Sequence, residues 1–299
     1  ILPPLMPILR RTGLIMARSR SGRKRVSLSV AKETKINRTD PESGYMVRDG
    51  KPKGFFYLDH RTVDSAHALI TDIHVTPGNV HDSMPYLSRL DRQRARFGFD
   101  VRAVGLDAGY FTAGIAKGLE DREIEGVIGY RRPTHRKGYL RKKDFEYLPG
   151  IDGYRCPQGE ILNYSTTNRS AYREYKSSPR VCKSCPLRDA CTQSRNHTKV
   201  VTRHVWQDSL EKITANRLSP WGKRIYERRK ETVERSFADA KQLHGHRYAR
   251  LRGLAKVREQ CLLAATAQNM KKIALILTRK GAFCDMLLWI VSNWARKHG

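Results

Sequence analysis

A short helical segment carries a carboxylate and a lysine at a spacing suited to metal and phosphate chemistry. Residues 231–241 read ETVERSFADAK, with Glu234 and Lys241 seven positions apart. Seven steps of about 100° return to nearly the same face of an α-helix, so both side chains are expected to point the same way. Such a pair can hold a metal ion and a phosphate together; a solvated Glu–Lys pair on an amphipathic helix is the alternative.

A second carboxylate, Asp107, follows a short apolar strand predicted over residues 101–106 and precedes a helix near 112–121. Open α/β sheets collect their ligands at the carboxyl ends of the strands. Because Mg²⁺ prefers a few carboxylates together with substrate phosphates, Asp107 is a candidate metal ligand. A simpler role as a helix N-cap is the alternative, since Asp is a favoured capping residue.

Four cysteines in the middle of the chain form a candidate metal site: Cys156, Cys182, Cys185 and Cys191. Two residues separate Cys182 from Cys185, the spacing of a tetrahedral zinc site. Cys191 follows five intervening residues later, and Cys156 lies 26 residues before Cys182. The pattern favours a structural zinc knuckle; free buried thiols and an iron–sulfur cluster are the alternatives. The remaining two, Cys261 and Cys284, lie in apolar helical runs and are expected in the core.

Hydrophobic periodicity predicts the elements that position these residues. Strands are expected over residues 55–64, 68–76, 101–106, 125–132 and 199–206, the first two as an antiparallel pair around Ser65–His67. Helices are expected over 83–96, 112–121, 225–245 and 253–277. In the first of these helices the residues expected to face inward are Met84, Leu87 and Leu90. In the last they are Leu254, Val257, Cys261, Ala265 and Met270. The order of strands and helices indicates an α/β layer with a mixed sheet.

Composition divides the chain into five segments. They are a disordered basic tail (1–34), the first part of an α/β core (35–132), a Cys-rich insertion (133–207) that opens with a basic linker (133–153), a helical part of the core (208–278) and a C-terminal tail (279–299). The first 30 residues hold seven Lys or Arg and no acid, which is typical of a segment that lies along phosphates.

The charge balance points to a polyanionic partner. Lys and Arg total 58 against 29 Asp and Glu, a formal charge of +29, and nucleic acid is the partner expected of such an excess. No apolar run approaches the roughly 18–20 residues that cross a bilayer, so no membrane partner is expected. Apolar residues 1–9 precede the basic ones, the reverse of a secretory signal, which favours a cytoplasmic, nucleoid-associated protein.

Four stretches occur in order along the chain: DPESGYMVRDGKPKGFFYLDHRTVD, VTPGNVHDSMPYLSRLDRQ, AVGLDAGY and VERSFADAK. Together, over roughly residues 35–275, they resemble a bacterial insertion-sequence transposase of the DDE superfamily, from the group with a cysteine-rich insertion before the glutamate helix. The resemblance implies a ribonuclease-H-like mixed sheet flanked by helices, with an inserted zinc-knuckle-like segment. It also implies two Mg²⁺ ions, structural Zn²⁺, and DNA cleavage and strand transfer during transposition.

Individual residues carry over from this resemblance. Asp107 matches the second catalytic carboxylate of the family and Glu234 the third. Residues expected to contact DNA are Lys241, Lys230, Arg229 and Tyr226. Tyr226 and Arg229 keep their mutual spacing but lie one residue too far from Glu234, and Lys230 occupies the arginine position. One residue turns a helix by about 100°, which places the roles of that pair in question.

The first carboxylate of the family has no counterpart at its expected place. Residues 1–39 contain no Asp, Asp40 belongs to the DPESG stretch, and Asp59, Asp64 and Asp72 lie on the following strands. The chain is therefore expected to be N-terminally truncated or frameshifted, and to bind DNA without efficient cleavage. Expected partners are the terminal inverted repeats and target DNA, both double-stranded, bound by a homodimer. The alternatives are a non-catalytic nucleic-acid-binding protein and a cellular nuclease or resolvase of the same fold.

Overall fold

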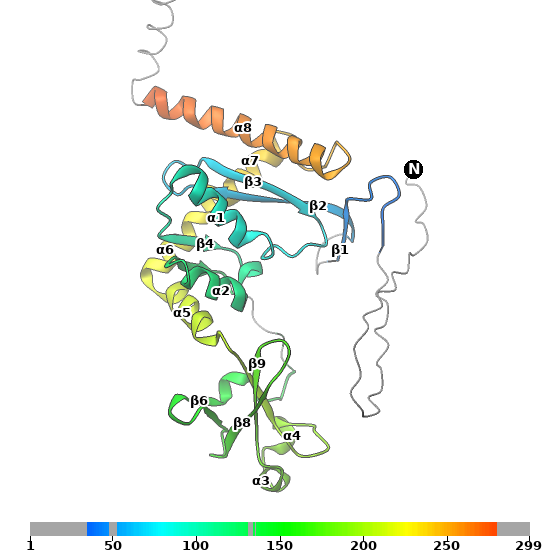
Figure 1. Cartoon of the computed structure of the whole chain (residues 1–299), viewed down its shortest axis with the longest axis vertical. Helices are drawn as coiled ribbons and strands as arrows, with labels where there is room; N and C mark the ends of the chain where they lie inside the picture. Colours follow the sequence, from blue (N-terminus) through cyan, green and yellow to red (C-terminus); the bar gives the residue numbers. More distant parts are fainter. Residues whose placement is uncertain (1–34, 48–52, 131–133, 135, 280–299) are drawn as a thin grey trace, which may run out of the picture. The chain divides into compact units, whose positions relative to one another are not determined.

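The computed structural model describes residues 35–47, 53–130, 134 and 136–279 (Figure 1). Its residues divide into two compact units, the first from residues up to 84 together with those from 227 onward, the second from residues 85–226. The expected basic tail, the C-terminal tail after residue 279 and Cys284 lie outside the described residues. In the part of the chain that is described, no helix is long and apolar enough to cross a lipid bilayer.

A long β-hairpin forms the centre of the first unit. Strand β2 (Gly54–Val63) pairs antiparallel with β3 (Ile70–Pro77), and the short β1 (Gly44–Met46) pairs with the start of β2. The Asp64 carboxylate closes the connection by accepting hydrogen bonds from the backbone N–H groups of His67, at 2.6 Å, and Leu69, at 3.1 Å. The predicted antiparallel pair around Ser65–His67 is confirmed.

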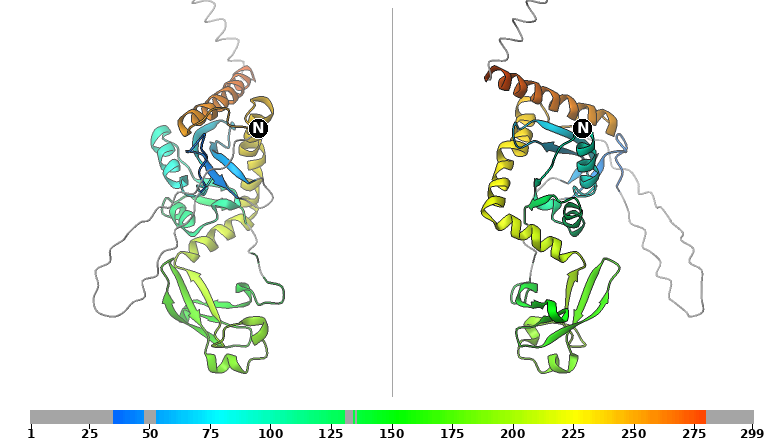
Figure 2. Two further views of the ribbon diagram at one scale, coloured as in Figure 1. Left: turned by 90° about the vertical axis from the view of Figure 1, so that its right-hand side faces the viewer. Right: turned by 60° about the vertical axis from the view of Figure 1, so that its left-hand side comes forward.

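Helix α8 (Leu254–Arg279) lies across this hairpin (Figures 1 and 2). The buried contact joins strand residues Ile70, Ile73 and Val75 to helix residues Val257, Cys261 and Ala265. The expected inward position of Met270 is wrong, because its side chain is 66% exposed. Five steps from Ala265 turn the helix about 140° away from the core-facing stripe, whereas Val257, Cys261 and Ala265 are spaced by four.

The helix predicted over 225–245 is interrupted by a wider turn. Helix α6 (Pro220–Arg229) leads into the π-helical segment η4 (Lys230–Glu234), and α7 (Arg235–Leu243) follows. A π turn bonds residue i to i+5 and so accommodates one residue more than an α turn. The extra residue between Arg229 and Glu234 is absorbed in this way: Arg229 Nη1 lies 3.6 Å from Glu234 Oε1.

The second unit contains a small parallel α/β layer. Strands β4 (Ala103–Leu106) and β5 (Glu125–Ile128) pair in parallel and are joined through η1 (Ala108–Tyr110) and α2 (Ala113–Glu120). Helices α1 (Tyr86–Phe97) and α5 (Gln207–Leu218) complete its core, which includes Tyr86, Leu90, Ile115, Leu119, Ile128 and Ile213. The expected inward position of Met84 is wrong, because α1 begins only at Tyr86 and Met84 is 76% exposed.

The Cys-rich segment forms a five-stranded antiparallel sheet of its own. Its order is β10 (Val200–His204), β9 (Tyr172–Lys176), β8 (Ile161–Thr167), β7 (Gly153–Arg155) and β6 (Glu146–Leu148). Short helices α3 (Pro179–Lys183) and α4 (Arg188–Cys191) lie between β9 and β10 in sequence. The expectation of a linker over 133–153 is wrong in its second half, which forms η2 (Lys142–Asp144), β6, η3 (Pro149–Ile151) and the start of β7.

The architecture is thus mixed α/β, as expected, but the single mixed sheet is not found among the described residues. Their strands form three separate sheets: β1-β2-β3, β4-β5 and β10-β9-β8-β7-β6. The order of elements along a sequence identifies strands by their periodicity, but it does not determine which strands exchange hydrogen bonds.

The π turn predicts an asymmetric response to deletions. Removing the exposed Lys230 should convert η4 into regular α-helix with a change of less than about 1 kcal/mol in the free energy of unfolding, because the downstream register is kept. Over its described residues, Leu254–Arg279, helix α8 contains no π turn that could absorb a deletion. Removing the exposed Glu259 should therefore lower the free energy of unfolding by more than about 3 kcal/mol, since Cys261 and Ala265 rotate out of the core. Urea denaturation measures both, and equal losses would contradict this account of the turn.

Candidate catalytic and metal-binding residues

The carboxylate of Glu234 is presented on the exposed side of a helix whose other side is fully buried. Thr232, Ser236 and Ala240 face inward at intervals of four and are 7%, 0% and 0% exposed. Glu234 keeps 52% of its side chain exposed while paired with Arg229. Both lysines of interest, Lys230 and Lys241, are exposed as well. The helix therefore offers the carboxylates of Glu231 and Glu234 and basic side chains to solvent.

A buried arginine on the hairpin fixes this helix. The side chain of Arg61 is fully buried. Its guanidinium donates from Nη1 to Ser236 Oγ at 2.9 Å and to the Ser236 carbonyl at 3.2 Å. It also lies over the Phe237 ring, 4.8 Å from the centroid. Its Nε donates to Asp59 Oδ2 at 2.8 Å. Gln268 of α8 joins the same network when its amide nitrogen donates to the Ser236 carbonyl and its amide oxygen accepts from Arg61 Nη1.

Asp107 lies directly after β4, as predicted. Its Oδ1 accepts a hydrogen bond from the Gly109 backbone N–H at 2.8 Å and so caps η1. The residue is nevertheless exposed. The two roles weighed from sequence are compatible, because one oxygen serves as a cap while the exposed carboxylate stays accessible to a cation.

Tyr226 reaches the turn that carries Asp107. A β-carbon added at Gly129, just after β5, would lie 2.6 Å from the Tyr226 hydroxyl and 2.9 Å from the Ala108 backbone N. The Tyr226 hydroxyl and the Ala108 backbone therefore both lie close to Gly129, which leaves no room for a side chain there. The Tyr226 hydroxyl thus lies near the turn that follows Asp107.

The expected site residues are distributed over the two units. Asp107 and Tyr226 belong to the second unit. Glu234, Arg229, Lys230 and Lys241 belong to the first. Within the first unit the structure brings Arg229 to Glu234, and within the second it brings Tyr226 to the Asp107 turn.

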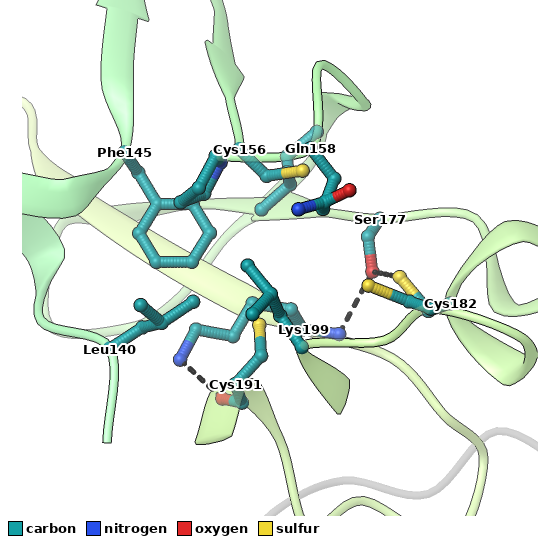
Figure 3. A pocket seen from close by; sticks show the side chains of 12 residues that line it. Leu140, Phe145, Cys156, Gln158, Ser177, Cys182, Cys191 and Lys199 are labelled. Atoms are coloured by element: carbon teal, nitrogen blue, oxygen red, sulfur yellow. Dashed lines mark hydrogen bonds between the residues drawn. The ribbon is translucent and has the colours of Figure 1, made fainter. Parts of the chain in front are cut away.

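The four cysteines of the insertion line one small cavity in the second unit (Figure 3). Cys156 follows β7, Cys182 and Cys185 come from α3 and the turn after it, and Cys191 ends α4. Apolar residues form most of the remaining lining, including Leu140, Phe145, Leu162 and Leu187, and Gln158, Ser177 and Lys199 also contribute. Several sulfur atoms in a largely apolar cavity suit a soft metal ion with tetrahedral coordination, such as Zn²⁺.

Cys191 is influenced electrostatically by the other three thiols of the cavity. Burial raises the pKa of Cys191, and the neighbouring Cys182, Cys156 and Cys185 raise it further, whereas Lys199 acts in the opposite direction. The Lys199 ammonium donates to the Cys191 carbonyl at 2.7 Å, and the Cys182 thiol donates to Ser177 Oγ at 3.2 Å. Mutual repulsion of the thiolates is what a bound cation would relieve.

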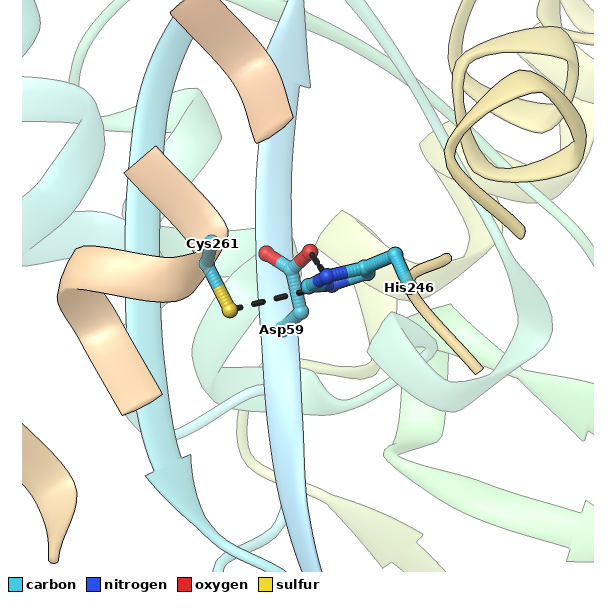
Figure 4. Close-up of side chains that lie close together, drawn as sticks. All are labelled: Asp59, His246 and Cys261. Atoms are coloured by element: carbon cyan, nitrogen blue, oxygen red, sulfur yellow. Dashed lines mark hydrogen bonds and ion pairs between the residues drawn. The ribbon is translucent and has the colours of Figure 1, made fainter. Parts of the chain in front are cut away.

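Sequence reasoning missed a second cluster with metal-ligating chemistry. Asp59 of β2, His246 of the α7–α8 connection and Cys261 of α8 place their ligand atoms within 4.8 Å of one another (Figure 4). Cys261 was expected only as a core residue, and its burial confirms that part. Burial, together with the Asp59 carboxylate, raises the Cys261 pKa to about 12. The three residues share no local spacing, so no sequence pattern signals the cluster.

Comparison with known families bears on these residues. Residues 155–274 match the family described as the Transposase DDE domain. The matched range contains the four cysteines, Glu234 and Lys241, but not Asp107. No curated protein and no solved structure matches the chain. A DDE transposase domain implies a phosphoryl-transfer enzyme that acts on DNA, and its family generally uses a divalent metal.

The buried arginine yields a stability prediction. Arg61→Ala should lower the free energy of unfolding by about 3–5 kcal/mol, because it leaves the largely buried Asp59 carboxylate without its guanidinium partner and Ser236 without its donor. Arg258→Ala, at an exposed position of α8, is the matched control and should cost less than about 0.5 kcal/mol. Urea denaturation of both variants is the measurement. A loss below about 1 kcal/mol for Arg61→Ala would show that the network does not hold the helix.

Proposed function

We propose that this chain is a transposase of a bacterial insertion sequence that binds the terminal inverted repeats of its element and target DNA. Asp107 and Glu234 are the carboxylates assigned to metal-dependent cleavage and strand transfer. Of these two, Glu234 lies inside the residue range that matches the Transposase DDE domain. Asp107 is assigned by its position directly after β4.

One observation carries the proposal. The Glu234 carboxylate is exposed on a helix that is anchored by buried Thr232, Ser236 and Ala240, and this helix lies inside the range that matches the Transposase DDE domain. A metal ligand requires such anchoring, because its reaction geometry depends on a fixed helix.

The two carboxylates are the type of ligand that a hard divalent cation prefers. Asp107 and Glu234 are both exposed oxygen donors, the ligand type that Mg²⁺ takes together with waters and substrate phosphates. When bound, Mg²⁺ would polarise the phosphate and lower the pKa of an attacking water. Arg229, paired with Glu234 at 3.6 Å, orients that carboxylate and holds positive charge beside it. Two such ions are expected in a site with its full set of carboxylates.

Basic side chains on and near the helix are assigned to the DNA backbone. Lys230 and Lys241 are exposed, and the chain carries a formal charge of +29. Contacts to phosphates supply affinity and register but no direct sequence information. Tyr226 and Arg229 complete the set of side chains assigned to DNA. The chain is further proposed to bind DNA as a homodimer in the cytoplasm.

DNA binding tests the role of the helix. Lys241→Ala should weaken binding to duplex DNA and reduce the slope of log affinity against log salt by about 1, because one phosphate contact is lost. Lys256→Ala, at an exposed lysine of α8, is the matched control and should leave the slope unchanged. Fluorescence anisotropy across a salt series measures both. Equal effects of the two variants would refute a specific phosphate contact at Lys241.

The Cys-rich sheet is assigned a structural zinc ion held by Cys156, Cys182, Cys185 and Cys191. The shared cavity, its largely apolar lining and the electrostatic influence of the other three thiols on Cys191 support this assignment over free thiols. The metal would join β7 to the two short helices between β9 and β10. It would stabilise a sheet whose buried core is limited to Phe145, Tyr154, Leu162, Tyr175 and Val201.

Removing two of these ligands should expose the zinc dependence. The double variant Cys182→Ser, Cys185→Ser should lose about one equivalent of zinc and the cooperative unfolding of the Cys-rich sheet. Ser184→Ala, at the exposed position between the two cysteines, should retain both. Elemental analysis and thermal unfolding are the measurements. Unchanged zinc content in the double variant would rule out the assignment.

A further inference from the structure

Three side chains from distant parts of the first unit converge on one point (Figure 4). His246 Nε2 lies 3.1 Å from Asp59 Oδ2 and 3.7 Å from Cys261 Sγ. The cluster is largely shielded from water: Cys261 is 2% exposed, and the side chains of Asp59 and His246 are each 12% exposed. A carboxylate, an imidazole and a thiol thus meet in a nearly closed space.

The two separations that involve His246 are close to those of ligands on one tetrahedral zinc ion, and all three ligand atoms lie within 4.8 Å of one another. With Zn–N and Zn–O bonds of about 2.1 Å and a Zn–S bond of about 2.3 Å, neighbouring N and O ligands lie about 3.4 Å apart, and N and S ligands about 3.6 Å apart. The observed 3.1 and 3.7 Å fall on either side of these values. Small side-chain adjustments therefore suffice to admit the ion.

Hydrogen bonding alone leaves the cluster unsatisfied. His246 Nε2 is directed at both Asp59 and Cys261, but one ring nitrogen is either a donor or an acceptor. If it donates to the carboxylate, it has no lone pair for the thiol. Asp59 Oδ1 is also buried and has no hydrogen-bond partner among the described residues. A cation at this point accepts electron pairs from all three groups at once.

We propose that Asp59, His246 and Cys261 form a second zinc site, which fastens the α7–α8 connection to β2 and α8. Sulfur and imidazole ligands select Zn²⁺ over Mg²⁺, which takes oxygen ligands. Three protein ligands leave a fourth position for water or another small ligand. The inference does not depend on the proposed transposase activity.

The site would order a basic segment. The connection that follows His246 carries Arg247, Arg250 and Arg252, all exposed. The sequence alone leaves this stretch as either a DNA contact or a solvated loop. Anchoring His246 to β2 and α8 would restrict where these arginines can reach, so metal loading would change how this face meets a polyanion.

Zinc content of the full chain tests the proposal. The parent chain should hold about two equivalents, one at the four cysteines and one here, and His246→Ala should hold about one. His244→Ala, two residues earlier in the same connection, is the control and should match the parent. Equal zinc in His246→Ala and the parent would overturn the proposal.

The two zinc assignments fail separately. If the four cysteines bind no metal, the parent holds about one equivalent, the Cys182→Ser, Cys185→Ser variant holds the same, and only His246→Ala loses it. A ligand exchange guards against simple unfolding: Cys261→His should keep the second equivalent but lose its share of the thiolate-to-metal charge-transfer absorption when Co²⁺ is the probe. A Cys261→His variant that loses the second equivalent and resembles His246→Ala would count against the site.

Discussion

The buried guanidinium of Arg61 is the interaction on which the first unit depends. It links three elements that are remote in sequence, by binding Asp59 on its own strand, Ser236 on α7 and Gln268 on α8. A charged group with a fully buried side chain is costly unless its partners are fixed. The network therefore selects one position for α7 against the hairpin, and with it the direction in which Glu234 points. It also sets the Asp59 carboxylate beside His246 and Cys261.

The π turn solves a related problem along the helix itself. Buried Thr232, Ser236 and Ala240 fix the phase of the segment from η4 onward, while Arg229 lies on the preceding helix. A regular helix would carry Arg229 about 100° away from the position that pairs with Glu234. The wider turn restores that pairing. Such turns often occur at functional positions, which is consistent with the assignment of Glu234.

Local patterns were predictable from the sequence, whereas long-range pairing was not. The β2–β3 hairpin, the strand before Asp107 and the C-x₂-C turn follow from periodicity and turn chemistry, and the structure contains all three. The separation of β4-β5 from β1-β2-β3 is set by hydrogen bonding between strands, which periodicity does not encode. The Asp59–His246 contact spans 187 positions, so only the folded chain reveals it. Arg61 was missed for the same reason, because a basic residue on a strand gives no sign of its partners.

The central claim is that the exposed carboxylate of Glu234 binds a divalent metal ion. The most direct measurement is protein cleavage by Fe²⁺ substituted for Mg²⁺, with ascorbate and hydrogen peroxide added, since radicals generated at the bound iron cut the nearby backbone. We predict cuts next to residue 234 that are suppressed by excess Mg²⁺ and absent from Glu234→Gln. No cleavage near residue 234, or equal cleavage there in Glu234→Gln, would contradict the assignment.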